Sequence, residues 1–319
     1  MIHAPLVVES LAPSVANPVA SPDVLTRYTC YKKLRSTLYG ETALYQDEEL
    51  KKLVVLKRLS IPLLQKEDNM SDAVKENPLS ERAVIQLLED PLVARAPGRE
   101  HVVEYEREGF FAAGDSVFVA MDFCAGGDLY DYVTAKPGRR LPETEALQLF
   151  AQIAKGLNFL HAIGVAHRDL SLENVLLKDG QVKICDFGLS ADANQFSADL
   201  VGKFYYMAPE VTDGAVYDPK GADVWSLGVL LFMMLTGSPL FADENTRSPT
   251  LRVLNKYGVG KILELWGLKE QLSKPTISLL TSMLQVQPSR RLSTEEVVRH
   301  PLLRGFGSLR TSSSMASPA

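Results

Sequence analysis

Short apolar runs separated by turn residues characterise the chain between residues 28 and 123. They occupy residues 28–34, 41–46, 51–59, 102–112 and 116–123. Short length and many Val, Leu, Tyr and Phe residues are typical of strands. Gly114-Asp115 separates the last two runs, and such a dipeptide between apolar runs indicates a β-hairpin. This part of the chain is expected to form a β-rich unit.

Apolar residues at helical spacing mark three longer segments. Residues 79–89 carry them at 79, 83, 84, 87 and 88, which predicts a helix with one buried stripe and Ser80 as a candidate N-cap. Residues 142–163 are amphipathic and begin with Pro142, a residue favoured in a first helical turn. Residues 223–235 are strongly apolar. We expect the last two segments to build a second, helical unit.

Three segments lack a regular apolar pattern. Residues 1–27 are rich in Pro, Ala, Ser and Val, which indicates a flexible arm. Residues 61–78 are polar and contain two prolines, so we expect a loop with a short helix at residues 71–76. Residues 304–319 are rich in Gly, Ser and Thr, which indicates a disordered tail. The folded domain is thus predicted to span residues 28–303.

The composition is that of an ordinary globular protein of 319 residues, with 46% hydrophobic and 23% charged residues. A formal net charge of −5 argues against a nucleic-acid binder. The three cysteines, Cys30, Cys124 and Cys185, are too few for a disulfide framework and suit a reducing compartment. The sequence shows no run of transmembrane length and no secretory signal. These features predict a soluble protein of the cytoplasm or nucleus that does not bind membranes.

Three short motifs follow one another in the middle of the chain. His167-Arg168-Asp169 is followed by Asn174, a predicted hairpin leads to Asp186-Phe187-Gly188, and Ala208-Pro209-Glu210 closes the stretch. Aspartate favours turns, but turns alone do not explain both aspartates at these spacings together with the other motif residues. In this order the motifs resemble the catalytic core of eukaryotic protein kinases. The resemblance extends over residues 28–303.

This resemblance implies an α+β fold with two lobes. Residues 28–121 would form a β-rich N-lobe with one main helix, residues 122–125 a hinge, and residues 126–303 a mainly helical C-lobe. The implied reaction is transfer of the ATP γ-phosphate to a Ser or Thr hydroxyl of a protein substrate, with Mg²⁺ as the second cofactor. Serine/threonine specificity is favoured because the catalytic loop lacks the pattern typical of tyrosine kinases.

The resemblance also assigns the catalytic and metal-binding residues. Phosphoryl transfer depends on positioning and charge neutralisation more than on covalent chemistry. Asp169 would accept or orient the proton of the attacking hydroxyl. Asn174 and Asp186 would hold Mg²⁺, which prefers a few carboxylate or amide oxygens together with phosphate.

Lys57 is the candidate for holding the α- and β-phosphates, because it follows the apolar run of a strand that resembles the corresponding kinase strand. In the family this lysine pairs with a helical glutamate. Glu81, one turn before the apolar stripe of residues 79–89, is the first candidate, and Glu76 and Glu89 are alternatives.

The other candidate nucleotide contacts take their places from the same resemblance. Met121 has the gatekeeper position, and the backbone of Asp122 and Cys124 in the hinge would bind adenine. Asp128 would lie near the ribose or near a basic residue of the substrate. The remaining candidates are Gly40, Thr42, Val55 and Leu176.

The glycine-rich loop of the family is degenerate in this chain. On the pattern G-x-G-x-x-G-x-V, only the last glycine is kept, as Gly40, while Arg35 and Thr37 replace the first two and Thr42 replaces Val. Glycines let backbone amides approach phosphate closely. We therefore expect weakened nucleotide affinity, with Arg35 either solvated or in contact with a phosphate oxygen.

Two further departures concern the catalytic loop. Serine/threonine kinases usually carry Lys two residues after the catalytic Asp, where this chain has Ser171, and Thr in the segment before Ala-Pro-Glu, where it has Lys203. In the family fold these two side chains meet beside the catalytic Asp. We interpret this as an exchange in which Lys203 supplies the charge that stabilises the γ-phosphate. The alternative is drift in a degraded enzyme.

The activation segment lies between Gly188 and Gly202. Arg168 precedes the catalytic Asp, and an Arg in that place can pair with a phosphate. Ser197 is the first candidate phosphate acceptor and Ser190 the second. Asp199 is an alternative source of fixed negative charge, and the segment could also need no phosphate.

Two structural pairings follow from the resemblance. Asp223 would brace the backbone of the catalytic loop, and Arg291 would pair with Glu210. Acidic Asp128 and Glu173 near the substrate groove favour a basic residue before the acceptor in the substrate. The rival functions are a pseudokinase scaffold, supported by the degenerate loop and Ser171, and a small-molecule kinase, which the Ala-Pro-Glu segment disfavours.

Overall fold

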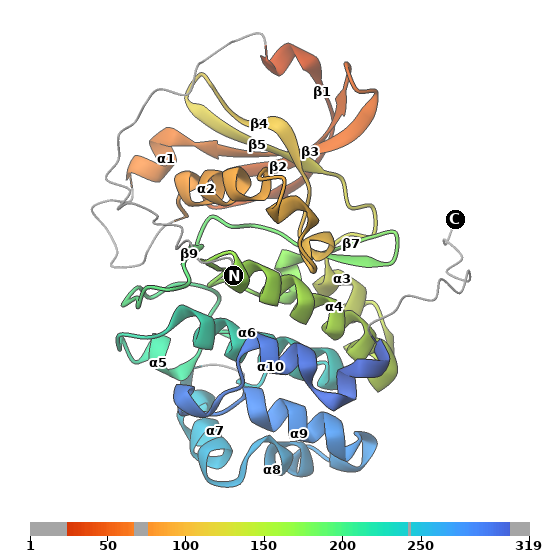
Figure 1. The fold of residues 1–319 in the computed structure, drawn as a ribbon, viewed down its shortest axis with the longest axis vertical. Coiled ribbons are helices and arrows are strands. Elements are labelled where there is room, and N and C mark those ends of the chain that lie inside the picture. Colours follow the sequence, from red (N-terminus) through yellow and green to blue (C-terminus); the bar gives the residue numbers. More distant parts are fainter. Residues whose placement is uncertain (1–23, 67–75, 242–243, 307–319) are drawn as a thin grey trace.

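The computed structural model describes residues 24–66, 76–241 and 244–306. Most of the predicted N-terminal arm, the short helix expected at residues 71–76 apart from its last residue, and the tail from residue 307 lie outside this part. Two lobes are stacked along the long axis, with a β-sheet in one and helices in the other (Figure 1). This arrangement confirms the α+β, bilobal fold.

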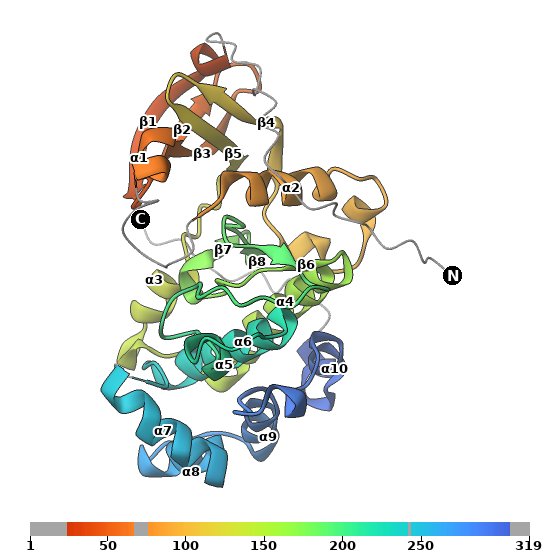
Figure 2. The same ribbon diagram turned by 90° about the vertical axis from the view of Figure 1, so that its left-hand side faces the viewer.

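The N-lobe is built on an antiparallel sheet of five strands in the order β1-β2-β3-β5-β4. Alternation along β3 places Val54 and Leu56 in an apolar cluster on one face, while Val55 and Lys57 face the cleft between the lobes. The long helix α2 (Pro78–Leu88) lies between the sheet and the C-lobe (Figure 2). The strands are β1 (Tyr28–Ser36), β2 (Gly40–Asp47), β3 (Lys52–Ser60), β4 (Tyr105–Ala113) and β5 (Ser116–Asp122).

Three local expectations for the N-lobe were wrong. Residues 61–66 form a short helix, α1 (Ile61–Lys66), because a proline at position 62 lies in the first turn, where its missing N–H is tolerated. The N-cap of α2 is Asn77, whose side chain accepts a hydrogen bond from the amide of Leu79 at 2.9 Å, and not Ser80. Residues 24–27 of the predicted arm form a 3₁₀ turn, and Arg27 binds buried Asp47.

The C-lobe is organised around two long helices. α4 (Glu143–Ala162) and α6 (Pro219–Thr236) pack against each other, and fifteen residues of α6 are buried. The predicted hairpin is present as β7 (Val175–Lys178) and β8 (Gln181–Ile184), and a second two-stranded pair joins β6 (Val165–Ala166) to β9 (Ala191–Asp192). The other helices are α3 (Leu129–Thr134), α5 (Pro209–Thr212), α7 (Glu244–Tyr257), α8 (Val259–Leu265), α9 (Lys274–Met283) and α10 (Thr294–Arg299).

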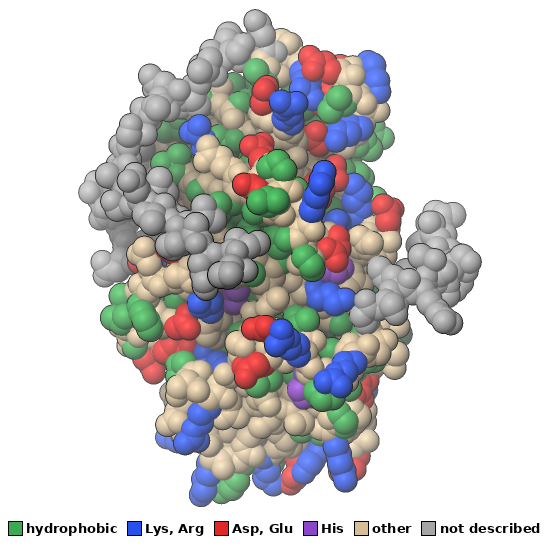
Figure 3. All heavy atoms as spheres, viewed as in Figure 1, with side chains coloured by type: hydrophobic (Ala, Val, Ile, Leu, Met, Phe, Trp, Pro, Cys, Tyr) green, Lys and Arg blue, Asp and Glu red, His purple; other side chains and the backbone are tan. Residues whose placement is uncertain are grey.

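Acidic and basic side chains are interspersed on the face shown in Figure 3, and neither sign dominates it. None of the helices in the described ranges combines the length and the apolar character needed to cross a bilayer. A last 3₁₀ helix runs over Pro301–Phe306, so its final three residues extend past the predicted boundary at Leu303.

Two buried ionic contacts brace the C-lobe in the predicted places. The carboxylate of Asp223 accepts hydrogen bonds from the backbone amides of His167 and Arg168, both at 2.8 Å, and it also contacts His161. Burial alone would raise the pKa of Asp223, but His161 and then His167 lower it below its ordinary value. Arg291 forms a two-bond pair with Glu210, with distances of 2.5 and 2.7 Å.

We expect Arg291→Ala to destabilise the protein by about 3 kcal/mol, because it leaves the carboxylate of Glu210, whose side chain is only 10% exposed, without its cation. Arg290→Ala is the matched control, since the neighbouring Arg290 is exposed. Urea unfolding measures both variants. Equal midpoints for the two variants would show that the pair with Glu210 contributes nothing to stability.

Candidate active site

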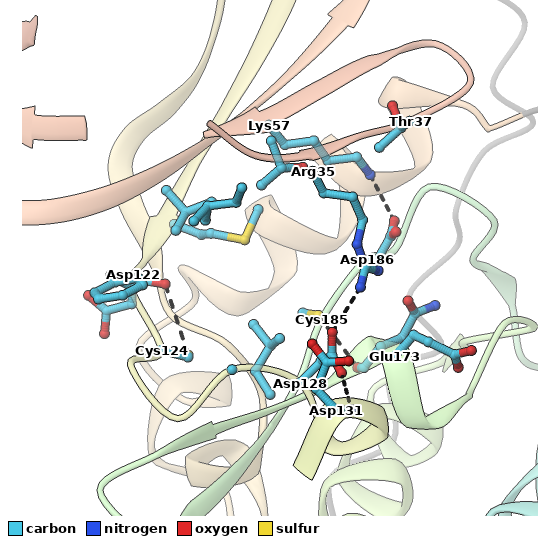
Figure 4. A pocket seen from close by; sticks show the side chains of 18 of the residues that line it. Arg35, Thr37, Lys57, Asp122, Cys124, Asp128, Asp131, Glu173, Cys185 and Asp186 are labelled. Atoms are coloured by element: carbon cyan, nitrogen blue, oxygen red, sulfur yellow. Dashed lines mark hydrogen bonds and ion pairs between the residues drawn. The ribbon is translucent and has the colours of Figure 1, made fainter. Parts of the chain in front are cut away.

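A cleft of about 470 Å³ lies between the N-lobe sheet and the C-lobe (Figure 4). Its walls come from the turn between β1 and β2, from β3, from the hinge and from the segments that flank β7 and β8. It brings together most of the residues predicted for nucleotide and metal binding. Those that line it are Thr42, Val55, Lys57, Met121, Asp122, Cys124, Asp128, Asn174, Leu176, Asp186 and Lys203.

Gly40 is a predicted nucleotide contact that does not line this cleft. It opens β2 and packs against the backbone of β3, where an added Cβ would fall 1.8 Å from the carbonyl oxygen of Arg58. Its glycine is therefore required by the close approach of two strands. Glu81, Asp169 and Ser171 also lie behind the lining and reach the cleft through their partners.

Lys57 is the centre of a buried charge cluster in the cleft. Its ammonium group lies 3.1 Å from the carboxylate of Glu81 and 2.8 Å from that of Asp186, and it also contacts Glu76. Burial alone would lower the pKa of Lys57, but the three carboxylates raise it well above its ordinary value. The predicted partner Glu81 and the alternative Glu76 thus both contact Lys57, whereas Glu89 is exposed at the end of α2.

Sequence reasoning missed Tyr105, which also belongs to this cluster. Its hydroxyl donates to the second carboxylate oxygen of Glu81 at 3.0 Å, and Glu81 itself is fully buried. Tyr105 lies on β4 and Glu81 on α2, so the contact depends on how two distant elements pack. Lys57 and Tyr105 thus donate to different carboxylate oxygens of Glu81, and the two hydrogen bonds together fix its orientation.

The carboxylates of Glu76, Glu81 and Asp186 lie close enough to share one cation, with ligand oxygens within 4.8 Å of one another. Burial raises the pKa of Glu76, and the nearby Asp186 adds to this effect. The pKa of Asp186 is lowered, because attraction to Lys57 outweighs burial. The cluster has more acidic than basic groups, which suits a site for a divalent cation.

Asp169 is held by three hydrogen bonds to its carboxylate. The backbone amide of Lys203 donates at 3.0 Å, its ammonium group at 2.8 Å, and the side-chain amide of Asn174 at 2.7 Å. Gly202 (φ 96°) permits this approach, since a Cβ there would lie 2.6 Å from the carbonyl oxygen of Arg168. The carboxylate of Asp169 is thereby fixed in position.

Lys203 also joins Asp169 to Ser171. Its ammonium group lies 3.0 Å from the hydroxyl of Ser171, so the three residues that sequence analysis grouped together do meet. The side chain of Lys203 is 37% exposed and lines the cleft. An ammonium group in this place can bind an anion that enters the cleft next to Asp169.

The activation segment is fastened to Arg168 by two of its side chains. The guanidinium of Arg168 donates to the carboxylate of Asp199 at 2.6 Å and to the hydroxyl of Ser197 at 3.1 Å. Burial would raise the pKa of Asp199, but its bond to Arg168 lowers it below the ordinary value. Ser190 is buried and donates to the carbonyl of Phe187, so it has a local structural contact.

The hinge presents backbone and a buried thiol to the cleft. The amide of Asp122 donates to the carbonyl of Glu104 at 2.9 Å, so that amide is already engaged and a bond to adenine would use other backbone groups. The carboxylate of Asp122 binds Lys178 at 2.6 Å. Burial raises the pKa of Cys124 to about 11, which keeps this sulfur a thiol at neutral pH.

Arg35 is largely exposed, and it also has a partner that sequence analysis did not name for it. Its guanidinium crosses the mouth of the cleft and donates to Asp128 at 2.9 Å, as Figure 4 shows. Asp128 also caps α3 by accepting a hydrogen bond from the amide of Asp131 at 2.8 Å. The degenerate loop is thus joined to the C-lobe by an ion pair that glycine could not make.

Comparison with known proteins agrees with this geometry. The protein kinase domain family matches residues 28–303. The chain is 34% identical over 197 residues to "Probable serine/threonine-protein kinase HSL1" of Saccharomyces cerevisiae, which covers 60% of the chain and 12% of that protein. It is 36% identical over 199 residues to maternal embryonic leucine zipper kinase of Xenopus tropicalis, which covers 60% of the chain and 29% of that protein.

The chain therefore spans less than a third of the length of either relative. The family match, by contrast, takes in both lobes, the cleft between them and all three motifs of the catalytic stretch. This chain belongs to the protein kinase family.

Proposed function

We propose that this chain is a serine/threonine protein kinase that transfers the γ-phosphate of ATP to a protein hydroxyl with Mg²⁺ as cofactor. The observation that carries the proposal is the meeting of Asp169, Asn174 and Lys203 beside the cluster of Lys57 and Asp186 in one cleft. Two relatives support the same reaction class, since one is named as a probable serine/threonine-protein kinase and the other as a kinase.

The residues present fit a nucleotide with its metal ion. Asp186 and Asn174 offer carboxylate and amide oxygens at the cleft, which are ligands that Mg²⁺ prefers. Lys57 offers a buried ammonium group that can bind phosphate oxygens, and Glu81 holds that group in place. When bound, the ion would neutralise charge on the phosphates. The excess of carboxylates around Lys57 favours binding of a cation there.

Asp169 would act on the attacking hydroxyl of the substrate. Three donors fix its carboxylate, so it can accept a hydrogen bond from that hydroxyl without reorganising. Lys203 would bind the oxygens of the transferring phosphate, and Ser171 would hold the ammonium group by its hydroxyl. The direction of the Lys203 side chain supports the exchange over drift, because its ammonium group lies 2.8 Å from Asp169 and the side chain lines the cleft.

We expect Lys203→Ala to lower peptide phosphorylation by a factor of about 10² to 10³, the usual effect of removing one preorganised charge. Asp169→Asn should abolish measurable turnover. The sharpest variant restores the arrangement common in the family. Lys203→Thr alone should be as inactive as Lys203→Ala, and the double variant Ser171→Lys/Lys203→Thr should recover most of the lost turnover.

Thermal melting of each variant separates a catalytic loss from unfolding. Unchanged turnover in Lys203→Ala would exclude the exchange but keep the kinase. A wild-type protein that binds ATP without transferring phosphate would instead support the scaffold function.

We further propose that Asp199 gives the fixed negative charge that Arg168 needs, and that Ser197 is not a required phosphate acceptor. Asp199→Asn should lower turnover about tenfold, because it removes a charge-assisted hydrogen bond worth about 1.5 kcal/mol. Ser197→Ala should change turnover little. Peptide assays on phosphatase-treated protein measure both variants. A large loss in Ser197→Ala with none in Asp199→Asn would make Ser197 the regulatory residue.

The raised pKa of Glu76 makes stability depend on pH in a defined direction. A carboxyl whose pKa is higher in the folded state stabilises the fold below its unfolded pKa, and this contribution is lost as pH rises through the folded pKa. Glutamine resembles the protonated form. Glu76→Gln should therefore match the wild type in stability at about pH 4 and become more stable than the wild type by about pH 8.

Urea unfolding in EDTA without nucleotide measures this difference. Glu89→Gln, at an exposed glutamate at the end of α2, is the matched control and should show no growing difference with pH. A Glu76→Gln variant that is less stable than the wild type at the higher pH would contradict the inferred direction.

A further inference from the structure

The mouth of the cleft carries three carboxylates on its C-lobe side. Asp128, Asp131 and Glu173 line it there, while Arg35 reaches across from the N-lobe (Figure 4). The side chain of Asp128 is 10% exposed and that of Arg35 is 54% exposed. Asp128 is thus fixed in the C-lobe, whereas the exposed side chain of Arg35 can move away from Asp128 into solvent.

Asp128 has one carboxylate oxygen for an outside partner. Oδ1 accepts the hydrogen bond from the amide of Asp131, which caps α3. Oδ2 accepts from the guanidinium of Arg35. Burial raises the pKa of Asp128, and the hydrogen bond from the amide of Asp131 and the charge of Arg35 oppose this rise. Asp128 therefore favours a cation beside Oδ2, and Arg35 occupies the place that a basic side chain of another molecule would take.

The reach of Arg35 follows from the local geometry of β1. The pairing of β1 with β2 is irregular between Lys33 and Arg35, and every side chain of β1 after Tyr28 is exposed. Arg35 is opposite Thr42, at the end of the strand nearest the cleft. Lys33, two residues earlier, pairs instead with Glu41 on the outer surface of the lobe.

We propose that Arg35 is an internal competitor for a basic residue of the peptide substrate and thereby determines specificity. The inference rests on the proposed kinase function and deepens it. While Arg35 binds Asp128, a basic substrate side chain gains little at this position. An ion pair with one half-exposed partner favours the paired state about fivefold. The apparent affinity for a basic peptide should then be about sixfold lower than for an unblocked site.

Peptide binding, measured by fluorescence anisotropy, tests this without requiring turnover. The probes are a short Ser peptide with a single Arg, moved through the positions before the acceptor, and its twin with Ala in place of Arg. Arg35→Ala should tighten binding of the best Arg peptide about sixfold and leave the Ala twin unchanged. Lys33→Ala is the matched control, because it removes a cation from the same strand outside the cleft, and it should change neither peptide.

The double variant Arg35→Ala/Asp128→Asn should not bind the Arg peptide more tightly than the wild type does. This result would show that the peptide Arg binds Asp128 once Arg35 is removed. An equal gain for both peptides would mean that Arg35 only narrows the cleft, and would overturn the proposal. An Arg35→Ala protein with no preference for the Arg peptide would also overturn it, as would a change confined to nucleotide affinity.

Turnover of the same peptides separates this inference from the proposed function. In one outcome, both proteins phosphorylate the peptides with the same ratio of kcat/KM for the Arg peptide to kcat/KM for its Ala twin. That result would overturn the role of Arg35 as a competitor and leave the kinase activity in place. Absence of phosphorylation by either protein, together with the expected change in peptide binding, would remove the kinase activity and leave the competitor in place.

Discussion

A single buried ammonium group, that of Lys57, joins the two lobes. The lysine is on β3 of the N-lobe, Glu81 is on α2, and Asp186 comes from the C-lobe beyond β8. A lysine this deeply buried is stable only where carboxylates surround it. Any motion of α2 or of the segment around Asp186 therefore changes how well this charge is balanced. The geometry of the cleft and the charge of Lys57 depend on each other.

Burial is the main cause of the raised pKa of Glu76, and the neighbouring carboxylates of the cluster around Lys57 add to it. Three carboxylates share one ammonium group, so at least one of them is poorly compensated. Lys57 contacts all three, Asp186 at 2.8 Å and Glu81 at 3.1 Å, and Glu81 also accepts a hydrogen bond from Tyr105. Burial together with the neighbouring carboxylates makes the charged form of Glu76 unfavourable. A bound divalent cation would supply the missing positive charge at this place.

The fold and most of the cleft could be predicted because their signals are local. The run before Lys57 and the spacing of Asp169, Asn174 and Asp186 are read directly along the chain. The Asn77 cap was missed because Asn and Ser are both good capping residues within one turn, and local sequence does not decide between them. Contacts of Tyr105 with Glu81 join residues 24 positions apart on different elements, and no sequence pattern signals them.

The same limit applied to Arg35, whose partner Asp128 is 93 residues away. Both basic residues that depart from the family pattern have nonetheless found acidic partners in the cleft: Arg35 binds Asp128, and Lys203 binds Asp169. If these changes were random losses of function, a new cation would face solvent as often as it would face a carboxylate. Pairing at both sites means instead that each new charge is balanced by an acid from another segment. At both positions the departure from the family pattern thus adds a cation together with a carboxylate that holds it.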